Sequence, residues 1–512
     1  MLQARRRPIS RGQQAISRPL PPPVGGWNAK DALDGMKPTD AVILENWFPR
    51  ESDVVTRGGY SLHCNTGEGA HNVETIAEFK AGATRKMLVG CNGKLINATT
   101  STPSTVGTGF TSNRWKWANF GERLIMVNGG DAPQDWDGTT LTATAWSGSG
   151  LTITNLSDVC VFKDRLFFIE KNTLNFWYAS LQAITGTLTK FPLKYTGTFG
   201  GVLKAMATVT IDGGSGPDDI MLFYLSSGEV IVYQGSDPSV AADWGRVGTF
   251  YISPPIAEGT VAQFGSDVVA LTHGAYTPIT RVMPYGRSSP AQLDLSDKIS
   301  GAVSQAAEQY SDNTGWQVIF YPFGRKLIFN IPRSASYFDQ HVMNVDTKAW
   351  CKFTGWNFPV FGLYNDNLYG GGTDGKVYQV DTGFSDNTTA ITCDLQTAWN
   401  YFGNSGQEKN FTMARVIFGA VSDPEAVMSI GTDFEIAIPT SAVETSDVDG
   451  GGEWDTAEWD VSEWAGSEQA IRGWQGITGQ GYSASMRLRV SVDAQEVALK
   501  SGNIIFKPAG MV

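Results

Sequence analysis

The sequence predicts an all-β protein on three observations. Its 512 residues include 58 Gly, 23 Pro, 16 Trp and 26 Phe, a composition poor in helix formers and rich in turn and strand residues. Apolar runs that flank a tight turn, the pattern of a β-hairpin, recur from about residue 60 to residue 381, as in "KMLVGCNGKLINA" and "NLYGGGTDGKVYQVD". The turns are on average (375 − 93)/6 = 47 residues apart when they are marked by Gly93, Gly138, Thr173, Gly228, Gly274, Gly324 and Gly375. Propeller blades repeat at about 40 to 50 residues.

Residues 1–24 predict an extended basic, proline-rich arm. Prolines cluster within residues 19–23, and such a stretch cannot close a hydrophobic core. A solvated tail without a role is the alternative. The candidate residues for docking on an acidic partner are the five arginines of the arm: Arg5, Arg6, Arg7, Arg11 and Arg18.

Residues 25–60 predict an entry segment with a short helix. Thr39 or Asp40 can serve as the N-cap of a helix that runs through Leu44, and Pro49 would end it.

Residues 61–384 predict a β-propeller-like domain of six to eight blades. One small sheet cannot bury both of its faces, whereas blades stacked around an axis bury them and leave only short edges. Ordinary antiparallel sandwiches remain the alternative, because the turn spacings are uneven and no sharp blade motif recurs. One helix is expected after Ser296 as N-cap, with an apolar face formed by Ile299, Val303, Ala307 and Tyr310.

Residues 385–512 predict a C-terminal β domain with a large acidic loop at about 440–475. In "MRLRVSV", apolar and polar residues alternate with the period of a strand. The predicted buried face consists of Met486, Leu488, Val490 and Val492. The last predicted strand is "NIIFK".

The charge of the chain argues against tight binding of DNA. The formal net charge is −12, and without the five arginines of the arm 39 − 5 = 34 cations face 51 anions in residues 19–512, a net charge of −17. Affinity for nucleic acid comes largely from Lys and Arg at phosphates, and an acidic body lacks this attraction. The five widely spaced cysteines indicate folding in a reducing cytoplasm. We also expect no signal peptide and no membrane span.

Patterns typical of catalysis or metal binding are scarce. The histidines form no HExxH pair, and no serine has the glycine spacing of a nucleophile elbow. "GGGTDGK" at 370–376 predicts a hairpin turn instead of a phosphate loop, because Val377 replaces the required Ser or Thr. The acidic, glycine-rich stretches at 212–219 and 447–455 are possible calcium ligands, but solvated loops of this composition are common. We therefore expect no enzyme activity, no catalytic residues, no metal and no cofactor.

The segment "EWDTAEWDVSEW" spaces its tryptophans five residues apart. This spacing scatters them around a helix and places alternate ones on opposite faces of a strand, so it produces no common aromatic platform. We interpret each Trp-Asp pair as the start of a repeated structural turn. The residues of this acidic repeat are Trp454, Asp455, Trp459, Asp460 and Trp464. The alternative is a glycosidase site in which the tryptophans stack on sugars and pairs such as Asp455 and Glu458 act as acid and base.

A short part of the sequence resembles a known family. "NAKDALD", "NWFPR" and "TRGGY", all within residues 25–63, are similar to the N-terminal region of tail nozzle proteins of short-tailed bacteriophages. These proteins are also called tail tubular protein B or packaged-DNA stabilisation proteins. The tryptophan repeat also resembles stretches common in phage virion proteins.

The resemblance implies a structural virion protein with a propeller body. Such a protein forms a ring, a hexamer in this family, below the portal and the head-to-tail adaptor, where tail fibre or needle proteins are further possible partners. The ring retains packaged DNA and conducts it during ejection without binding it tightly. The chain would be made in the host cytoplasm and reside in the virion tail. A glycan-binding or glycan-cleaving tail protein is the alternative.

Overall fold

The structure is a computed structural model that describes residues 14–212, 217–285, 294–436, 438–439, 441–443 and 469–511. Strands dominate the described residues, as expected for an all-β protein, and the α-helices among them are α1 (Ile279–Val282) and α2 (Ser300–Tyr310). The chain divides into two units. The first contains Met1–Arg57, Ala349–Cys351 and Thr389–Val512, and the second contains Gly58–Lys348 and Lys352–Thr388.

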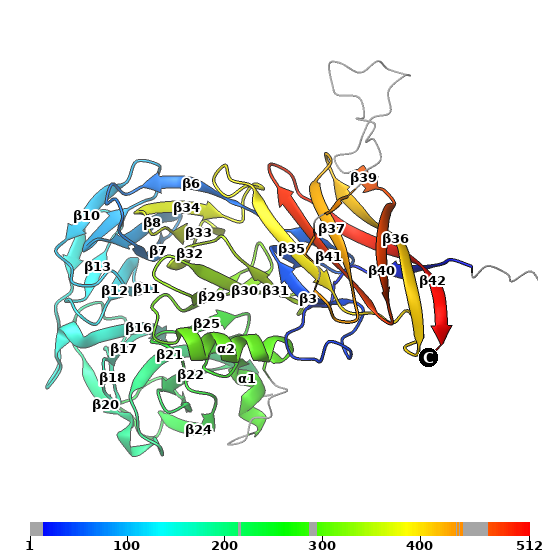
Figure 1. The fold of residues 1–512 in the computed structure, drawn as a ribbon. Coiled ribbons are helices and arrows are strands. Elements are labelled where there is room, and N and C mark those ends of the chain that lie inside the picture. The colour runs from blue at the N-terminus through cyan, green and yellow to red at the C-terminus, as the bar shows by residue number, and fades with distance from the viewer. Residues whose placement is uncertain are drawn as a thin grey trace, which may run out of the picture. The chain divides into compact units, whose positions relative to one another are not determined.

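The second unit contains seven antiparallel groups of strands (Figure 1): six are small sheets, and one, the sixth, is the first three strands of a ten-stranded sheet. Each group is called a sheet below. The first three are β7 (Val73–Ala81), β8 (Thr84–Cys91), β9 (Lys94–Asn97) and β10 (Ser104–Thr108); β11 (Lys116–Phe120), β12 (Arg123–Val127), β13 (Gln134–Trp136) and β14 (Leu141–Ala143); and β16 (Leu156–Phe162), β17 (Arg165–Glu170), β18 (Asn175–Tyr178) and β20 (Thr189–Pro192). The fourth and fifth are β21 (Leu203–Asp212), β22 (Pro217–Leu225), β23 (Glu229–Gln234) and β24 (Gly245–Tyr251); and β25 (Val261–Phe264), β26 (Asp267–Leu271) and β27 (Tyr276–Pro278). The sixth includes β28 (Gln317–Tyr321), β29 (Lys326–Pro332) and β30 (Phe338–Asn344), and the seventh joins β32 (Val360–Tyr364), β33 (Asn367–Gly371) and β34 (Lys376–Val380) to β6 (Tyr60–Asn65).

The first strands of these sheets contact one another in a closed circuit. β7 contacts β11, and the contacts continue through β16, β21, β25, β28 and β32 back to β7. β6, from the N-terminal end of the unit, supplies the outer strand of the seventh sheet beside β34, so the two ends of the unit meet in one sheet. This arrangement is propeller-like, and it protects strand edges that would otherwise be open.

The predicted turns fall where the sequence placed them. Each of the seven sheets contains one turn marker, and each marker lies between two consecutive strands of its sheet. Gly93 lies between β8 and β9, for example, and Gly375 lies between β33 and β34. The stretch at 370–376 is such a hairpin turn, as predicted. The 47-residue spacing therefore reports the repeat of sheets along the chain.

The hydrophobic core of this unit lies between successive sheets. Between the third and fourth sheets, the rings of Phe176 and Phe223 stack at 4.6 Å, and Trp244 stacks on Tyr233 at 5.3 Å. Between the first and second sheets, Phe79 packs on Trp136 at 5.4 Å. Large aromatic side chains fill the wedge-shaped space between neighbouring sheets, which explains the aromatic-rich composition.

Helix α2 confirms the predicted helix but not its cap. Ile299, just before the helix, and Val303 and Ala307 within it are buried, as the helical spacing predicted. The side chain of Ser296 makes no cap hydrogen bond, and its Oγ instead accepts a hydrogen bond from the backbone N of Tyr276 at 2.9 Å. The first turn is a 3-10 helix, η5 (Asp297–Ile299).

The first unit consists of two antiparallel-rich sheets. One contains β1 (Ile16–Leu20), β4 (Trp47–Pro49), β5 (Val54–Thr56), β36 (Gln407–Ala420), β39 (Gln469–Arg472), β40 (Gln475–Gly481) and β42 (Ala498–Met511). The other contains β2 (Gly26–Trp27), β3 (Asp40–Glu45), β35 (Ile391–Thr397), β37 (Glu425–Thr432), β38 (Ser441–Ala442) and β41 (Ala484–Val492). The alternating face of β41 is buried as predicted, and "NIIFK" lies inside the longer β42.

The remaining elements are short. The second unit also has a two-stranded parallel sheet of β15 (Trp146–Ser147) and β19 (Gly186–Thr187) and the 3-10 helices η1 (Ile153–Asn155), η2 (Leu193–Tyr195) and η3 (Met283–Tyr285). β31 (Trp350–Phe353) spans a point where the chain passes between the units. Within the described ranges, no helix has the length and hydropathy that crossing a membrane would require.

Two expectations for the entry segment were wrong. The helix predicted from Thr39 or Asp40 through Leu44 is the strand β3, whose Leu44 pairs with Leu395 of β35, because pairing with a buried strand outweighs a weak local helix signal. The entry segment and the C-terminal domain are not separate, since residues up to Arg57 belong to the same unit as Thr389–Val512.

The predicted arm and loop are likewise partly strand. Ile16–Leu20 pairs with β42, so this end of the arm is not free. The loop expected at 440–475 contains β38 at its start and β39 near its end, while residues 444–468 lie outside the described ranges.

Candidate functional site

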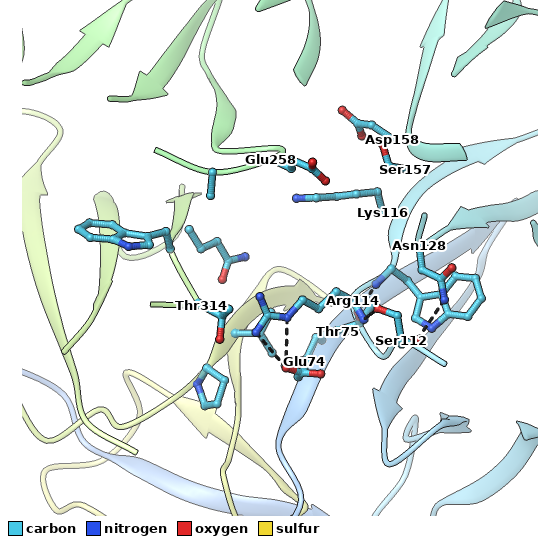
Figure 2. Close-up of a pocket in the computed structure, with 18 of the residues that line it drawn as sticks. Glu74, Thr75, Ser112, Arg114, Lys116, Asn128, Ser157, Asp158, Glu258 and Thr314 are labelled. Carbon is cyan, nitrogen blue, oxygen red and sulfur yellow. Dashed lines mark hydrogen bonds and ion pairs between the residues drawn. The ribbon is translucent and has the colours of Figure 1, made fainter. Parts of the chain in front are cut away.

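A cavity of about 550 Å³ lies in the propeller-like unit where the first strands of six sheets begin (Figure 2). Thr75 of β7, Lys116 of β11 and Asp158 of β16 line it near the starts of their strands. The fifth, sixth and seventh sheets contribute residues at or just before their first strands, namely Ala257, Glu258, Gln317 and Val360. The circuit of first strands therefore brings polar residues from six distant parts of the sequence to one place.

One wall of the cavity carries an ion pair. The guanidinium of Arg114 donates to Oε1 of Glu74 through Nε at 3.1 Å and Nη2 at 2.9 Å. Close by, the hydroxyl of Thr75 donates to the carbonyl of Asn113 at 2.6 Å and accepts from the backbone N of Trp115 at 2.8 Å. These contacts tie the first sheet to the second where the cavity opens.

The other wall gathers three charged side chains: Lys116, Asp158 and Glu258 (Figure 2). Lys116 Nζ donates to the carbonyl of Gly259 at 3.2 Å, so it links the second sheet to the segment that leads into the fifth. Glu258 also pairs with Lys204 of the fourth sheet at 3.4 Å. The cavity contains both signs of charge in nearly equal number, three cations (Arg114, Lys116 and Lys171) and four anions (Glu74, Asp158, Glu258 and Asp312).

Asp158 has a perturbed acidity. Burial raises the pKa of its carboxyl to about 6, although the charge of Lys116 and hydrogen bonds from the backbone N of Val159 and Met206 lower it. These hydrogen bonds measure 3.0 Å and 3.4 Å, and the second reaches the fourth sheet. Asp158 therefore gains a proton at a pH at which ordinary carboxyls remain ionised.

The lining suits a neutral, polar ligand better than an anionic one. The lining includes the polar residues Ser112, Asn128 and Ser157, and the balanced charges do not concentrate phosphates. Among the described residues, no cluster of His, Cys, Asp and Glu could hold a metal ion. Described His63 and His341 bond elsewhere, to the carbonyl of Ala98 and to the hydroxyl of Tyr276.

The site residues predicted from the sequence are not brought together in the part of the chain that is described. Arg18 lies on β1 as an exposed residue opposite Ile504. The other arginines of the arm, Arg5, Arg6, Arg7 and Arg11, lie outside the described residues, as do Trp454, Asp455, Glu458, Trp459, Asp460 and Trp464. The acidic stretch at 212–219 is described only in part, since residues 213–216 lie outside it.

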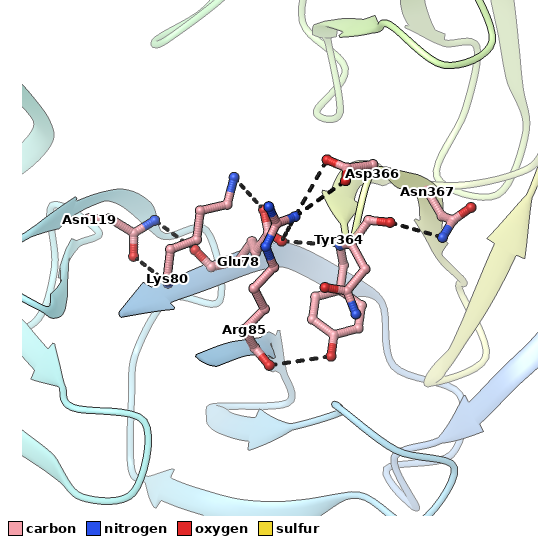
Figure 3. A network of polar contacts seen from close by, with 8 residues as sticks. Glu78, Lys80, Arg85, Asn119, Tyr364, Asp366 and Asn367 are labelled. Carbon is pink, nitrogen blue, oxygen red and sulfur yellow. Dashed lines mark hydrogen bonds and ion pairs between the residues drawn. The ribbon is translucent and has the colours of Figure 1, made fainter. Parts of the chain in front are cut away.

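A second polar cluster joins the seventh, first and second sheets (Figure 3). The nearly buried carboxylate of Glu78 on β7 contacts Lys80 Nζ at 2.8 Å and accepts from the backbone N of Asn365 at 3.1 Å. The carbonyl of Glu78 accepts from Asn119 Nδ2 at 2.8 Å. Arg85 completes the cluster by contacting both Glu78 and Asp366. These contacts fasten three sheets at the position where the circuit closes.

The five cysteines are free thiols, and four of them are buried. Burial raises the pKa of Cys64 and of Cys91 to about 11 and the pKa of Cys160 to about 12. A raised pKa keeps a thiol protonated and unreactive at neutral pH.

Comparisons with known proteins do not identify a family. No protein-family model and no curated protein matches the chain. Among solved structures, it is similar to PorZ, a bacterial surface component of the type-IX secretion system of Porphyromonas gingivalis, at 11% identity and a TM-score of 0.36, over 62% of this chain and 37% of PorZ. It is also similar to Raptor of Chaetomium thermophilum, at 9% identity and a TM-score of 0.40, over 63% of this chain and 29% of Raptor. A third is BBS1N in complex with ARL6DN, at 10% identity and a TM-score of 0.38, over 64% of this chain and 98% of that one. At these values the comparisons assign no function, and the chain spans well under half the length of PorZ and Raptor.

Proposed function

We propose that this chain is a structural subunit of the tail of a short-tailed bacteriophage. In this proposal it is a nozzle protein that assembles as a ring, with six copies below the portal and adaptor. The ring extends the channel, retains packaged DNA and conducts it during ejection. No catalysis is required for this role, and the chain acts through shape, assembly and charge.

The observation that carries the proposal is the structural role of the segment that resembles the family. Asn28 of "NAKDALD" is buried, and its Nδ2 donates to Asp31 and Asp40, each at 2.9 Å. Arg57 of "TRGGY" is buried as well, and its Nε donates to Oδ1 of Asn46 at 2.9 Å. The similar residues therefore build the interior of the first unit, where a family would keep the residues that define its fold.

The form of the second unit supports the same proposal. We infer that its seven sheets are the blades of a seven-bladed propeller closed by β6, which falls within the expected six to eight. The cavity of this unit carries nearly balanced charges, which do not attract phosphate groups. A channel protein that lets DNA slide should likewise lack sites that hold phosphates.

Assembly on a purified head-to-tail adaptor tests this proposal. Mass photometry of the full chain mixed with adaptor rings should show about six copies per ring, as a closed cyclic assembly requires. Electron microscopy of the same mixture should show density that extends the channel. One copy per ring, or no association at any salt concentration, would refute the nozzle role.

A glycan-binding tail protein is the second candidate, and the cavity is the observation that favours it. Its volume is typical of small-ligand sites, and its lining combines hydroxyls with paired charges, groups that bind sugars. Calorimetric titration with host-envelope oligosaccharides should then show binding that Arg114→Ala removes. Absence of binding by the wild-type chain excludes this candidate.

A further inference from the structure

The loop between the third and fourth sheets exposes two large aromatic side chains. In this loop, residues 193–202, Tyr195 is 79% exposed and Phe199 is 67% exposed. Exposed aromatic pairs of this size are uncommon on a surface without a partner.

The 193–202 loop is held firmly despite these exposed rings. Buried Leu193 anchors its start, and the carbonyl of Leu193 accepts hydrogen bonds from the backbone N of Thr196 and Gly197. The fully buried carboxylate of Glu229 accepts from the backbone N of Thr198 at 2.8 Å and of Phe199 at 2.9 Å. A surface that is already ordered loses little entropy when it binds, as binding hot spots require.

Two cations lie at this loop on an otherwise acidic chain. Lys194 Nζ lies 4.8 Å from the centre of the Tyr195 ring, and Arg246 Nη1 donates to the carbonyl of Thr196 at 3.5 Å. The surface is therefore basic and aromatic, although the whole chain has a net charge of −12.

The chain itself contains a segment of complementary chemistry. Residues 453–464, the acidic tryptophan segment, hold five carboxylates and three tryptophans without a cation. Indoles stack on Tyr and Phe rings and on cations, and carboxylates pair with Lys and Arg. Two different complementary surfaces on one chain are what a head-to-tail ring contact needs.

We propose that the 193–202 loop, together with Arg246, receives the acidic tryptophan segment of a second copy of this chain. The proposal rests on the proposed ring for its choice of a second copy. Repeated from copy to copy, this heterologous contact would join neighbours around the ring.

Peptide binding tests the match of the two surfaces without any phage component. A labelled peptide of residues 450–467 is titrated into a full-length acceptor in which Trp454, Trp459 and Trp464 are replaced by serine, so that its own segment does not compete. We expect saturable binding that weakens with salt and that falls at least about tenfold when Tyr195→Ser and Phe199→Ser are added. The matched control adds Phe323→Ser and Tyr337→Ser, whose side chains are 79% and 66% exposed, and it should bind normally. Absence of binding, or equal binding by both variants, overturns the proposal.

Mixing two complementary variants tests whether two copies can make the contact, and the wild-type chain then shows whether they do. The loop variant (Tyr195→Ser, Phe199→Ser) retains the segment, and the segment variant retains the loop, so only a mixture of them contains one complete contact. Sedimentation should show each variant as a monomer alone and a one-to-one dimer in the mixture. A mixture that stays monomeric at concentrations well above the dissociation constant of the peptide refutes the contact between copies, because neither variant can make it within its own chain. A wild-type chain that stays monomeric at these concentrations while the mixture dimerises shows that the segment docks on its own chain, and this also refutes the ring contact. Failure to join an adaptor ring while the mixture dimerises would instead refute only the nozzle role.

Discussion

Replacing Glu229 with glutamine should destabilise the propeller-like unit through the 193–202 loop. Its carboxylate is fully buried and accepts two backbone hydrogen bonds from that loop and one from the hydroxyl of Tyr251 at 3.0 Å. Glutamine keeps one acceptor oxygen, but its side-chain NH2 group replaces the other oxygen. This NH2 group is a donor, and it would face a group that itself donates a hydrogen bond in the wild type. A hydrogen bond to a charged group contributes about 1.5–3 kcal/mol, and removal of the buried charge recovers part of the loss. We expect the free energy of unfolding to fall by about 2–4 kcal/mol at pH 7.

The effect of Glu229→Gln should depend on pH. Burial raises the pKa of Glu229, but the hydrogen bonds from Phe199, Thr198 and Tyr251 outweigh burial and hold the pKa below its ordinary value of 4.5. Because the folded-state pKa is the lower one, the carboxylate contributes stability above the unfolded-state pKa, and this stability is lost as the pH falls through the folded-state pKa. The difference between wild type and variant should therefore shrink from about pH 5 to about pH 3.

Urea unfolding and hydrogen exchange measure this prediction together. Unfolding followed by tryptophan fluorescence gives the free-energy change, and exchange of a peptide that covers residues 193–203 reports the loop directly. Glu308→Gln, at an exposed position of α2, is the matched control and should change neither quantity. A Glu229→Gln protein with wild-type stability and wild-type exchange at pH 7 would refute the view that this carboxylate holds the loop.

Four further predictions follow from other residues. Burial raises the pKa of Asp158 to about 6, so ionisation costs folded-state stability as the pH rises from about 4 to about 7; a thermal unfolding series of Asp158→Asn should lack that decline, and a variant that keeps it would contradict the prediction. Lys409 is 2% exposed and donates hydrogen bonds from Nζ to three backbone carbonyls, so Lys409→Met should lower the free energy of unfolding in urea by about 2–4 kcal/mol. A change below about 0.5 kcal/mol would show that these carbonyls find other partners. Deleting residues 2–13 preserves the strand β1, so the melting temperature should stay constant while binding to the adaptor weakens at physiological salt; unchanged binding would make the arm a passive tail. A chain that lacks residues 1–13 should show no submicromolar affinity for duplex DNA at about 0.15 M salt in fluorescence anisotropy. Tight binding would contradict the proposal that DNA slides through the channel without binding to the protein.

Local pattern predicted the repeating part of this fold well. Turn chemistry at positions such as Gly93 and Gly228, with apolar runs on both sides, placed hairpins correctly in each of the seven sheets. The alternation in "MRLRVSV" predicted which side chains of β41 are buried. These features depend on neighbours in sequence, because a tight turn fixes its own two strands and a period of two fixes which face is apolar.

The candidate cavity was beyond reach of sequence patterns. Thr75, Asp158 and Val360 are separated by dozens to hundreds of residues, and each alone is an ordinary polar or apolar residue at the start of a strand. Polar residues near the starts of some first strands, such as Thr75, Lys116 and Asp158, were an available signal, but uneven spacing between sheets hides it. Glu229 was likewise not singled out, because a single acidic residue before an apolar run carries no sign that two backbone N–H groups of another segment will meet it.

The sequence by itself determined the all-β class, the repeat of small sheets, the acidic body and the buried face of β41. Tertiary structure alone decided that β6 closes the seventh sheet, that Ile16–Leu20 joins β42, and that Asp40–Glu45 is a strand beside β35 instead of a helix. Strand pairing between distant segments depends on which edges remain open once the local hairpins have formed. Which pairing forms depends on the burial and hydrogen bonding of the whole unit. The residue pattern of a short segment therefore does not predict its distant partner.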